Sequence, residues 1–434
     1  MASAARKPVS KKNAVQSNST FQHLAAAEAA LNRILPMTQP ADAELHRFFR
    51  AYPELGKQDR QFIAETVFGI LRRRIGLEYH TGADNARRLL LAYLNRVQGM
   101  SVRQLEPLMA KDDAEWAAQL KARSDAEVPL YVKAELPQWL VTVLARDMAD
   151  DEMLALGRAL QQPAPLDVRV NAVTAQRDKV MQQLAIEGFK VQPTPYSPLG
   201  LRIDGNPALG RNALFTSGRI EIQDEGSQLL SYLVAPKRRE MIVDFCAGAG
   251  GKTLALGALM QSQGRLYAFD VSDSRLNKMK PRLKRSGLSN VHPQLLANEN
   301  DIKVKRLGGK IDRVLVDAPC SGFGTLRRNP DLKWRQTETA IAELTAKQLR
   351  ILTAAAALVK TGGRVVYATC SFVRAENQDV VNAFLAAHPQ FTLVPANQVL
   401  AHCQIPLDTG EFLQLYPHIH GCDGFFAAVL ERKA

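Results

Sequence analysis

The spacing of apolar residues changes twice along the chain and divides it into three predicted regions. From residue 21 to 145 the apolar positions recur at helical intervals, as in GKQDRQFIAETVFGILRRR, and strand patterns are scarce. Pro163 and Pro165 then interrupt the pattern in QQPAPLDVRVN, because each proline biases the residue before it away from helix. The first region is therefore predicted to be a helical bundle that ends ahead of these prolines.

A short mixed region follows, from residue 146 to 212. It contains a strand pattern at residues 166–170, a helix pattern near residues 177–187 and a turn-rich run with three prolines, Pro193, Pro195 and Pro198. We interpret this region as a small α/β domain, similar to an RRM, that links the helical bundle to the rest of the chain.

The third predicted domain spans residues 213–434. Beyond residue 236, strand patterns at MIVDF, RLYAFD, VHPQLL, IDRVLVD and GGRVVYAT alternate with helix-length segments such as residues 337–360. That alternation is typical of a parallel sheet covered by helices on both faces. We expect an α/β fold of the Rossmann-like class, with ligands at the carboxyl ends of the strands.

The N-terminal segment differs from all three domains. Residues 1–20 carry four basic residues and no acidic one, among mostly Ala, Ser and Asn. Such a segment buries too little apolar surface to fold, which predicts a disordered basic tail. An organelle transit peptide is the alternative, although the segment lacks clear amphipathic spacing.

Charge indicates a polyanion as partner. The net charge is +13 and the pI about 9.6, and residues 275–310 hold ten Lys or Arg against two acidic residues. Residues 111–165, by contrast, hold six basic and ten acidic residues. A concentrated positive field of this kind favours nucleic acid, because each phosphate that is neutralised releases counterions. Five arginines of the helical region either contact phosphate or line a solvated helix face: Arg72, Arg73, Arg74, Arg87 and Arg88.

The cysteines and the hydropathy of the chain indicate in which compartment the protein works. The five cysteines are an odd number and none stands in CxxC spacing, so we expect neither a disulfide framework nor a metal site. No apolar run reaches the roughly eighteen residues that cross a bilayer, and the N-terminus lacks a secretory core. The expectation is a cytoplasmic protein with free thiols, no membrane association and no obligate protein partner.

A glycine-rich turn follows the first strand of the third domain, in MIVDFCAGAGGKT. Gly248, Gly250 and Gly251 allow the backbone to turn tightly and approach a ligand, and the next helix offers free N–H donors. Neither GxGxxG nor the GxxxxGK spacing is present, which argues against a dinucleotide or a nucleoside triphosphate.

Two further positions complete the predicted cofactor site. Asp270 ends the next strand, where a carboxylate accepts hydrogen bonds from ribose hydroxyls; the alternative is that it caps the helix that begins near Ser272. The turn that begins at Asn298 is positioned to meet an adenine edge.

Two cysteines each follow a predicted strand. Cys320 lies in VLVDAPCSGFGTLRRNPDLKW, after the strand that ends at Asp317, and Cys370 lies in VVYATCSFVRAEN. A lone cysteine is usually a small core residue, but two cysteines at the carboxyl edge of one sheet, beside a glycine loop, indicate thiols that take part in a reaction. Carbon 5 of cytosine accepts a methyl group only after a thiolate adds to carbon 6, and a second group then assists release.

These strings carry a family resemblance. The sequence resembles the NOL1/NOP2/Sun (Fmu/RsmB-like) family of RNA 5-methylcytosine methyltransferases in three motifs: CAGAGGKT, DAPCSGFGTLRRNPDLKW, and YATCSF with Glu376 and Asn377. Two further strings agree with the family, GRIEIQDEGSQLL and CDGFFAAVL, and the match spans residues 160–434. The helical region is similar to the NusB-like RNA-binding domain of the bacterial branch that methylates small-subunit ribosomal RNA.

The resemblance implies a role for each matching residue. Cys370 would be the nucleophile, Cys320 would assist elimination, and Asp317 would contact both the cytosine and the methionine end of the cofactor. S-adenosylmethionine would be held by Cys246, Ala247, Gly248, Ala249, Gly250, Gly251, Lys252, Asp270, Asn298 and Asp317. The RNA backbone would lie near Arg327, Arg328, Lys333 and Arg335.

The chain departs from the family pattern at three positions. Ala249 stands where the family usually has Pro, which would soften the loop. Asn298 stands where the adenine-contacting residue is usually Asp, with Asp301 as an alternative. Pro281 falls inside a predicted helix and should kink it.

None of the departures touches the thiols. Retention of both cysteines and Asp317 favours an active enzyme over a non-catalytic RNA-binding assembly factor. A DNA cytosine methyltransferase is a weaker alternative, because the resemblance implies attack by the TCS cysteine and not by one in a PC motif, and because the helical region suits structured RNA. Resemblance to the bacterial branch makes small-subunit (16S) ribosomal RNA the expected substrate, with transfer RNA as the alternative.

Overall fold

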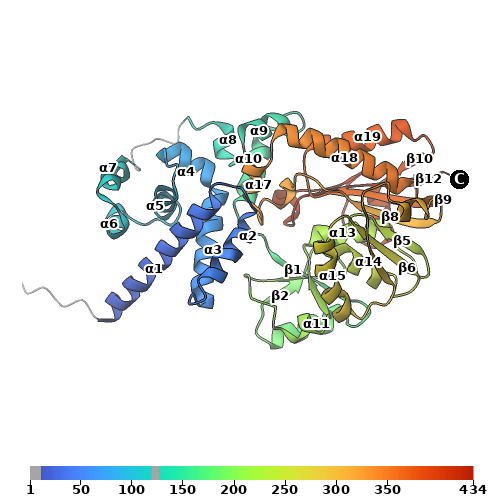
Figure 1. The fold of residues 1–434 in the computed structure, drawn as a ribbon, viewed down its shortest axis with the longest axis horizontal. Helices are drawn as coiled ribbons and strands as arrows, with labels where there is room; N and C mark the ends of the chain where they lie inside the picture. The colour runs from blue at the N-terminus through green and yellow to red at the C-terminus, as the bar shows by residue number, and fades with distance from the viewer. Residues whose placement is uncertain (1–10, 120–126, 434) are drawn as a thin grey trace, which may run out of the picture. The chain divides into compact units, whose positions relative to one another are not determined.

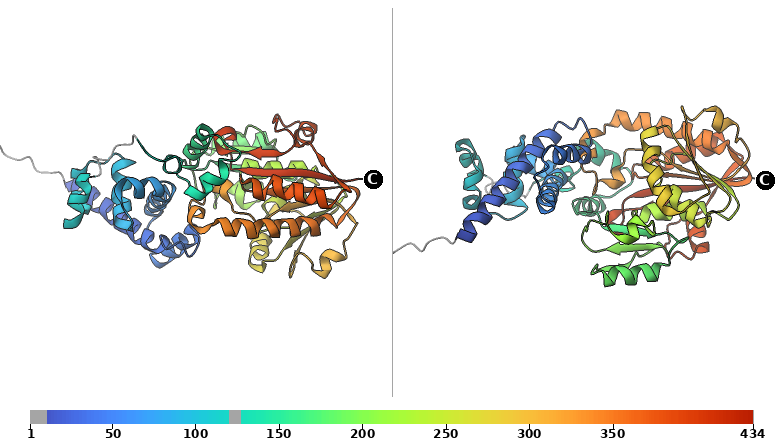
Figure 2. Two further views of the ribbon diagram at one scale, coloured as in Figure 1. Left: turned by 90° about the horizontal axis from the view of Figure 1, so that it is seen from above. Right: turned by 60° about the horizontal axis from the view of Figure 1, so that its bottom comes forward.

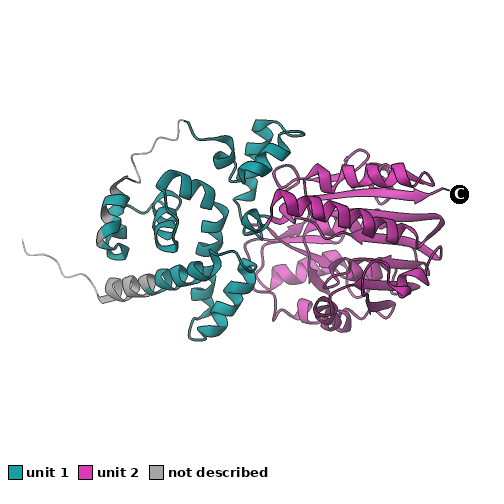
Figure 3. Cartoon of the chain, turned by 45° about the horizontal axis from the view of Figure 1, so that its top comes forward, with its two compact units in different colours: residues 1–162, 326–335 teal, residues 163–325, 336–434 magenta. Residues whose placement is uncertain are grey.

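The computed structural model describes residues 11–119 and 127–433 of the chain. They fall into two compact units (Figure 3): unit 1 is Met1–Gln162 with Leu326–Arg335, and unit 2 is Pro163–Thr325 with Gln336–Ala434. Each unit has a buried apolar core of its own. Within the described ranges, no helix is long and apolar enough to cross a lipid bilayer.

Unit 1 is helical, as the apolar spacing predicts. Helices α1, α3 and α5 pack around one core, and local signals set their ends: the Asn85 side chain accepts a hydrogen bond from the Arg88 N–H and caps α5. The helices are α1 (Lys11–Ile34), α2 (Ala41–Ala51), α3 (Lys57–Arg72), α4 (Arg74–Thr81), α5 (Ala86–Arg96), α6 (Val102–Leu105), η1 (Glu106–Leu108), α7 (Lys111–Gln119), α8 (Leu130–Lys133), α9 (Gln138–Leu144), α10 (Asp150–Leu160) and α17 (Leu332–Arg335).

The limits of unit 1 differ from the predicted ones. Helix α1 begins at Lys11, inside the segment that the sequence predicts to be a disordered basic tail. Residues 1–10, half of the segment that the transit-peptide alternative concerns, lie outside the described residues. At the other end, the unit continues past residue 145 and includes α10.

The main sheet of unit 2 has the predicted parallel core. Its strands follow the order β10-β12-β9-β8-β5-β6-β7, with β11 paired to β12; the five from β9 to β7 are parallel, and β12 and β10 are antiparallel additions that the alternation does not predict. The strands are β5 (Met241–Asp244), β6 (Arg265–Asp270), β7 (Val291–Leu295), β8 (Ile311–Asp317), β9 (Val359–Thr369), β10 (Phe391–Val394), β11 (Leu413–Leu415) and β12 (Phe425–Arg432).

Helices cover both faces of this sheet (Figure 1), as in the Rossmann-like methyltransferase pattern. Helices α18 and α19 lie on one face, which Figure 2 shows from above, and α13, α14 and α15 lie on the other. The helices are α13 (Glu225–Val234), α14 (Gly251–Leu259), α15 (Asp273–Ser286), α16 (Ile302–Lys305), η2 (Phe323–Thr325), α18 (Glu338–Ala356), η3 (Arg374–Glu376), α19 (Gln378–Ala387), α20 (Ala396–His402) and α21 (Pro417–His420).

A small antiparallel sheet of order β2-β3-β1-β4 forms the start of unit 2. The predicted strand and helix are confirmed as β1 and α11, which share an apolar core. Because β4 pairs with β1, this sheet extends past the predicted boundary at residue 212. Its elements are β1 (Leu166–Val170), α11 (Arg177–Ile186), β2 (Val191–Pro193), β3 (Gly200–Ile203), α12 (Ala213–Thr216) and β4 (Ile220–Ile222).

Gly324 and Gly424 bring two loops of unit 2 into backbone contact. The Gly424 N–H donates to the Gly324 carbonyl (2.8 Å), and a Cβ on Gly324 would lie 2.0 Å from the Gly424 oxygen. Gly324→Ala should therefore lower the free energy of unfolding by about 1–3 kcal/mol through overpacking, measured by urea denaturation.

Gly210→Ala is the matched control, because a Cβ at Gly210 meets no atom within 4 Å. Its effect should stay within about 0.5 kcal/mol. Equal stability of the two variants would contradict the close-contact explanation.

Candidate active site

The glycine loop connects β5 to α14 and turns back on itself. Gly248 (φ 56°) and Gly250 (φ 88°) adopt left-handed backbone conformations that favour glycine. A Cβ on Gly250 would lie 2.6 Å from Met279 of α15, whereas a Cβ at Gly248 would meet no atom within 4 Å. The loop therefore packs tightly beneath Gly250 and borders open space at Gly248, as a ligand cradle requires.

Asp270 lies beside this loop at the end of β6. Its carboxylate is buried and accepts hydrogen bonds from the Gly248 N–H (2.8 Å) and the Ser272 N–H (2.7 Å). The cap of α15 is Ser272, whose side chain accepts from the Arg275 N–H, so the helix-cap alternative for Asp270 is wrong. Asp270 is instead fixed against the glycine loop.

Arginines hold the loop from behind. Arg282 of α15 donates to the Ala249 carbonyl (2.7 Å) and also to Glu221 of β4, and Arg169 of β1 donates to the Gly251 carbonyl (3.0 Å). The expected softening at Ala249 is thus opposed by a charged hydrogen bond to its carbonyl. Helix α15 that supplies Arg282 is continuous through Pro281.

The two adenine candidates have different surroundings. Asp301 caps α16: its carboxylate accepts from the Lys303 and Ala297 N–H groups, and these bonds lower its pKa. Asn298 uses its side-chain oxygen to accept from the Asn300 N–H (2.8 Å), which leaves its amide nitrogen as a donor. Because Asp301 is committed to a helix end, Asn298 remains the better candidate.

The loop is joined to the thiol-bearing edge by an ion pair. Lys252 Nζ lies 2.7 Å from Asp317 Oδ2, at the end of β8, and 5.5 Å from the centre of the Phe425 ring. Burial acts to lower the pKa of Lys252, but Asp317 outweighs it and the net shift is upward. Lys252 is therefore a stable cation, and both the pairing and Phe425 are features that the sequence does not reveal.

The two predicted thiols meet. Cys320 and Cys370 follow adjacent parallel strands, β8 and β9, and their Sγ atoms are 3.3 Å apart. The hydrogen bond to Cys370, together with burial, raises the pKa of Cys320 well above its ordinary value. Cys320 is therefore a protonated thiol at neutral pH, and either sulfur can be the donor in the hydrogen bond between them.

Comparisons with known proteins agree with this geometry. Residues 231–431 match the family model for the 16S rRNA methyltransferase RsmB/F, and residues 136–209 match the ferredoxin-like domain of RsmF/B-like methyltransferases. A probable ribosomal RNA small subunit methyltransferase B from a Synechocystis strain is 31% identical over 90% of this chain and 95% of its own length. This chain belongs to the RsmB/F methyltransferase family.

Other relatives extend the comparison. A Bacillus subtilis protein of the same name is 29% identical over 88% of this chain and 92% of its own length. The crystal structure of a protein called PH0851 covers 95% of this chain and 99% of its own, with a TM-score of 0.79 and 26% identity. The RsmB/F chain is therefore an enzyme of the methyltransferase class, with the fold that its sequence predicts.

The RsmB/F site contains one group that sequence reasoning missed. Asp244 ends β5, is fully buried, and accepts from the Thr253 hydroxyl through Oδ2 (2.7 Å), while Oδ1 has no partner among the described residues. Burial raises the pKa of Asp244 to about 7. Burial likewise raises the pKa of Cys246, so that predicted loop residue is a protonated thiol at neutral pH. The acid that ends the strand before the glycine loop was the available signal for Asp244.

The predicted RNA contacts in residues 326–335 require a correction. Arg327 and Lys333 are buried within unit 1, where Lys333 donates to the Arg72 carbonyl and faces Glu135. Burial lowers the pKa of Lys333 and raises that of Glu135. Arg327 and Lys333 are thus buried among other residues of unit 1, whereas Arg328 is half-buried and Arg335 is exposed.

The arginines of the helical unit also have protein partners. Arg72 donates to the Arg327 carbonyl (2.8 Å), Arg74 lies 5.0 Å over the Trp334 ring, and Arg87 pairs with Asp113 (2.8 Å). Neither predicted alternative, phosphate contact or solvated face, describes Arg72, because its guanidinium is half-buried and donates twice to the Arg327 carbonyl. The charge of this segment is largely used inside unit 1.

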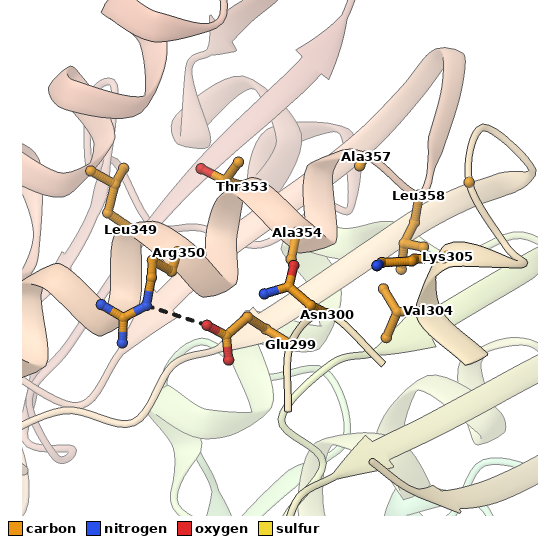
Figure 4. A pocket seen from close by; sticks show the side chains of 11 residues that line it. Glu299, Asn300, Val304, Lys305, Leu349, Arg350, Thr353, Ala354, Ala357 and Leu358 are labelled. Atoms are coloured by element: carbon orange, nitrogen blue, oxygen red, sulfur yellow. Dashed lines mark hydrogen bonds and ion pairs between the residues drawn. The ribbon is translucent and has the colours of Figure 1, made fainter. Parts of the chain in front are cut away.

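A cavity of about 700 Å³ lies elsewhere in unit 2, between α16 and α18 (Figure 4). Glu299 and Arg350 reach toward one another at one end of it, 3.3 Å apart, and its other walls are mainly apolar. Its lining includes neither thiol nor any residue of the glycine loop. The cavity is therefore separate from the candidate active site.

The thiol contact predicts a change in reactivity. Replacing Cys370 by Ala removes the largest cause of the raised pKa of Cys320, so the pKa should fall toward its ordinary value and the thiolate fraction should rise. Alkylation of Cys320 by iodoacetamide at pH 8, followed by peptide mass spectrometry, should be about tenfold faster per unit decrease in that pKa. Alkylation of Cys403, away from this pair, serves as the internal control. An unchanged Cys320 rate would argue against the hydrogen bond.

Proposed function

We propose that this enzyme transfers a methyl group from S-adenosylmethionine to carbon 5 of a cytosine in small-subunit (16S) ribosomal RNA. The substrate class is supported by relatives that are named small subunit ribosomal RNA methyltransferases, and the bacterial source of those relatives supports a cytoplasmic setting. The cytosine-5 chemistry is carried by one observation, the pair of sulfurs 3.3 Å apart at the sheet edge. A single cysteine that only fills space in a core would have no second sulfur beside it.

The cofactor would occupy the space bordered by the glycine loop. The open side of Gly248, the fixed carboxylate of Asp270 and the unpartnered oxygen of Asp244 fit a ligand with ribose hydroxyls and an ammonium group. Asn298 would meet the adenine edge, and Asp317 with Lys252 would lie at the methionine end. When bound, S-adenosylmethionine supplies the methyl group.

The thiols would act in sequence on the cytosine ring. The Cys370 sulfur adds to carbon 6, and the electron pair of the 5,6 double bond makes carbon 5 nucleophilic. After methylation, Cys320, which has by then released its own proton to water, accepts the proton from carbon 5 as a thiolate; the double bond forms again, and the bond between carbon 6 and the Cys370 sulfur breaks, which returns Cys370 as a thiolate. Asp317 would contact the polar edge of the cytosine base and hold the base in place.

The proposed division of roles takes Cys320 as the donor in the hydrogen bond between the two sulfurs, one of the two directions that the 3.3 Å contact allows. A thiol that donates to a neighbouring sulfur stabilises negative charge on the acceptor. The raised pKa of Cys320 is consistent with Cys320 as donor, which makes Cys370 the sulfur prepared for attack.

The target cytosine must be single-stranded or extruded from a helix for a thiol to reach carbon 6. Arg328 and Arg335 are the two predicted RNA contacts that retain exposure, and Arg335 also pairs with Asp331 (3.3 Å). We keep these two as phosphate contacts. The helical unit, with its proposed NusB-like character, would bind structured RNA.

The roles of the thiols are tested by trapping. Cys320→Ala should leave attack intact and stall release, so that the protein remains covalently bound to its RNA and migrates slowly on a denaturing gel. Cys370→Ala should abolish the slow band and lower methylation by ~10³-fold or more, the scale seen when a nucleophile is lost. Methylation is followed by bisulfite sequencing of ribosomal RNA.

The Cys403→Ala variant is the control, because this thiol lies in the core around α13 and α20. Methylation by the Cys370→Ala variant would refute the assignment. Failure of every variant and of the native enzyme to methylate ribosomal RNA would favour transfer RNA as substrate or a non-catalytic assembly role.

Cofactor binding is tested at Asp270. Asp270→Asn should raise the Kd for S-adenosylmethionine in calorimetry by ~10-fold or more, because a charge-assisted hydrogen bond is worth about 1.5–3 kcal/mol. Asp273→Asn is the matched control: Asp273 is exposed in the first turn of the same helix and bonds only to Asn277 among the interactions found. An unchanged Kd for the Asp270 variant would remove Asp270 from the site.

A further inference from the structure

One buried carboxylate lies between the two loops that carry the thiols. Glu376, in η3, is 0% exposed and accepts four hydrogen bonds. Its Oε1 accepts from the Ser321 N–H (2.8 Å) and from Gln348 Nε2 (3.0 Å), and its Oε2 accepts from the hydroxyls of Ser321 (2.5 Å) and Ser371 (2.6 Å). Both oxygens are therefore fully engaged.

The partners of Glu376 identify what it connects. Ser321 directly follows Cys320, and Ser371 directly follows Cys370. One carboxylate thus binds the loop after β8 and the loop after β9 at the positions next to their sulfurs. The Gly324 N–H, which donates to the Cys370 carbonyl (2.9 Å), joins the same two loops a second time.

The carboxylate is itself held in position. The Tyr367 hydroxyl donates to the Glu376 carbonyl (2.6 Å), and the Asn377 amide donates to the Ser371 carbonyl (3.0 Å). Gln348 of α18 also donates to the Pro319 carbonyl (3.0 Å), one residue before Cys320. These bonds hold the backbone of Glu376 and the side chain of Gln348 beside the two thiol loops.

The contacts of the Glu376 side chain favour a carboxylate. The Ser321 N–H and the Gln348 amide group can only donate to it, and in the structure the two serine hydroxyls also donate, which suits a group that only accepts. A glutamine at this position would keep the volume, but it would lose the charge that strengthens all four bonds and would force the two hydroxyls to accept from its amide N–H₂.

We propose that Glu376 is a positioning residue that holds the Cys320 and Cys370 loops together, so that both sulfurs face the same substrate ring. The spacing of the sulfurs is a property of the free enzyme and does not depend on the proposed function. The catalytic consequence does rest on the proposed function: the clamp keeps Cys320 close to the carbon 5 proton that it must accept.

The spacing is tested without substrate. In full-length protein, a diazene oxidant such as diamide converts the two thiols to a disulfide and is itself reduced to the hydrazine. Peptide mass spectrometry then follows the linkage between Cys320 and Cys370. Glu376→Gln should form it ~10-fold or more slowly than the native enzyme, because small displacements of paired reacting groups carry penalties of this size.

The matched control is Glu225→Gln. Glu225 is a buried glutamate of the same unit that accepts from the N–H groups of Tyr196 (2.6 Å) and Ser197 (2.8 Å), outside the thiol loops. Its replacement should lower the melting temperature and leave the rate of disulfide formation unchanged. A purely structural role for Glu376 predicts the same behaviour for the Glu376→Gln variant, which would overturn the proposal.

The catalytic consequence has a separate readout. Glu376→Gln should lower kcat by ~10²-fold, leave the Kd for S-adenosylmethionine unchanged, and accumulate the covalent RNA adduct as Cys320→Ala does. If disulfide formation slows but no cysteine variant traps RNA, the positioning role stands and the proposed chemistry fails.

A folding defect leaves the proposal testable. If Glu376→Gln does not fold, Ser371→Ala decides the question, because it removes one contact of the clamp and keeps the carboxylate. It should slow disulfide formation by ~3-fold or more, because a hydrogen bond to the carboxylate no longer holds the loop after β9. A rate equal to that of the native enzyme would overturn the proposal.

Discussion

The register between β8 and β9 determines where the chemistry lies. In this parallel pair Asp317 lies opposite Ala368, so Cys320 and Cys370 leave the sheet within a residue of each other and their sulfurs meet. A slip of one residue would move a strand by about 3.3 Å and turn its side chains to the opposite face. The fully buried residues of both strands prevent that slip, which makes the thiol pair a consequence of core packing.

The same edge gathers carboxylates from three neighbouring strands. Asp244, Asp270 and Asp317 end β5, β6 and β8, and their combined charge contributes to the raised pKa values of Asp244 and Cys246. Lys252 offsets part of that charge through its ion pair. An acidic edge in a protein of net charge +13 suits a cationic ligand such as a sulfonium, while phosphate is attracted to other surfaces.

Local patterns were sufficient to predict the elements that carry this edge. Each strand of the parallel core is a short apolar run, and the glycine loop and both cysteines follow such runs directly, so their convergence could be inferred from the general behaviour of parallel sheets. The antiparallel β12 was not predicted as such, because a strand reads alike in either direction. The element types of the helical region could also be predicted, but the start of α1 could not, since the polar composition of residues 11–20 predicts a tail and gives no signal for the start of a helix.

What escaped prediction depends on distant partners. Lys333 has the sequence neighbourhood of a surface cation, and its buried partners, Glu135 and the Arg72 carbonyl, lie 198 and 261 residues earlier in the chain. Glu376 stands out as part of a motif, yet its function as a clamp exists only when Ser321 is brought beside it. Long-range pairing of polar groups leaves no periodic signal, whereas apolar burial does.

The same limit applies to charge. The ten basic residues between 275 and 310 predict one binding face, but Arg282 and Arg285 pair with the buried Glu221 (3.0 and 2.6 Å) and support the glycine loop and small sheet. Lys278, Lys280 and Lys284 of α15 are exposed. Because only exposed cations release counterions from a polyanion, the salt dependence of RNA binding by this segment should follow the exposed lysines and not its total charge. A count of basic residues therefore overstates the RNA-facing surface wherever arginines serve as internal braces.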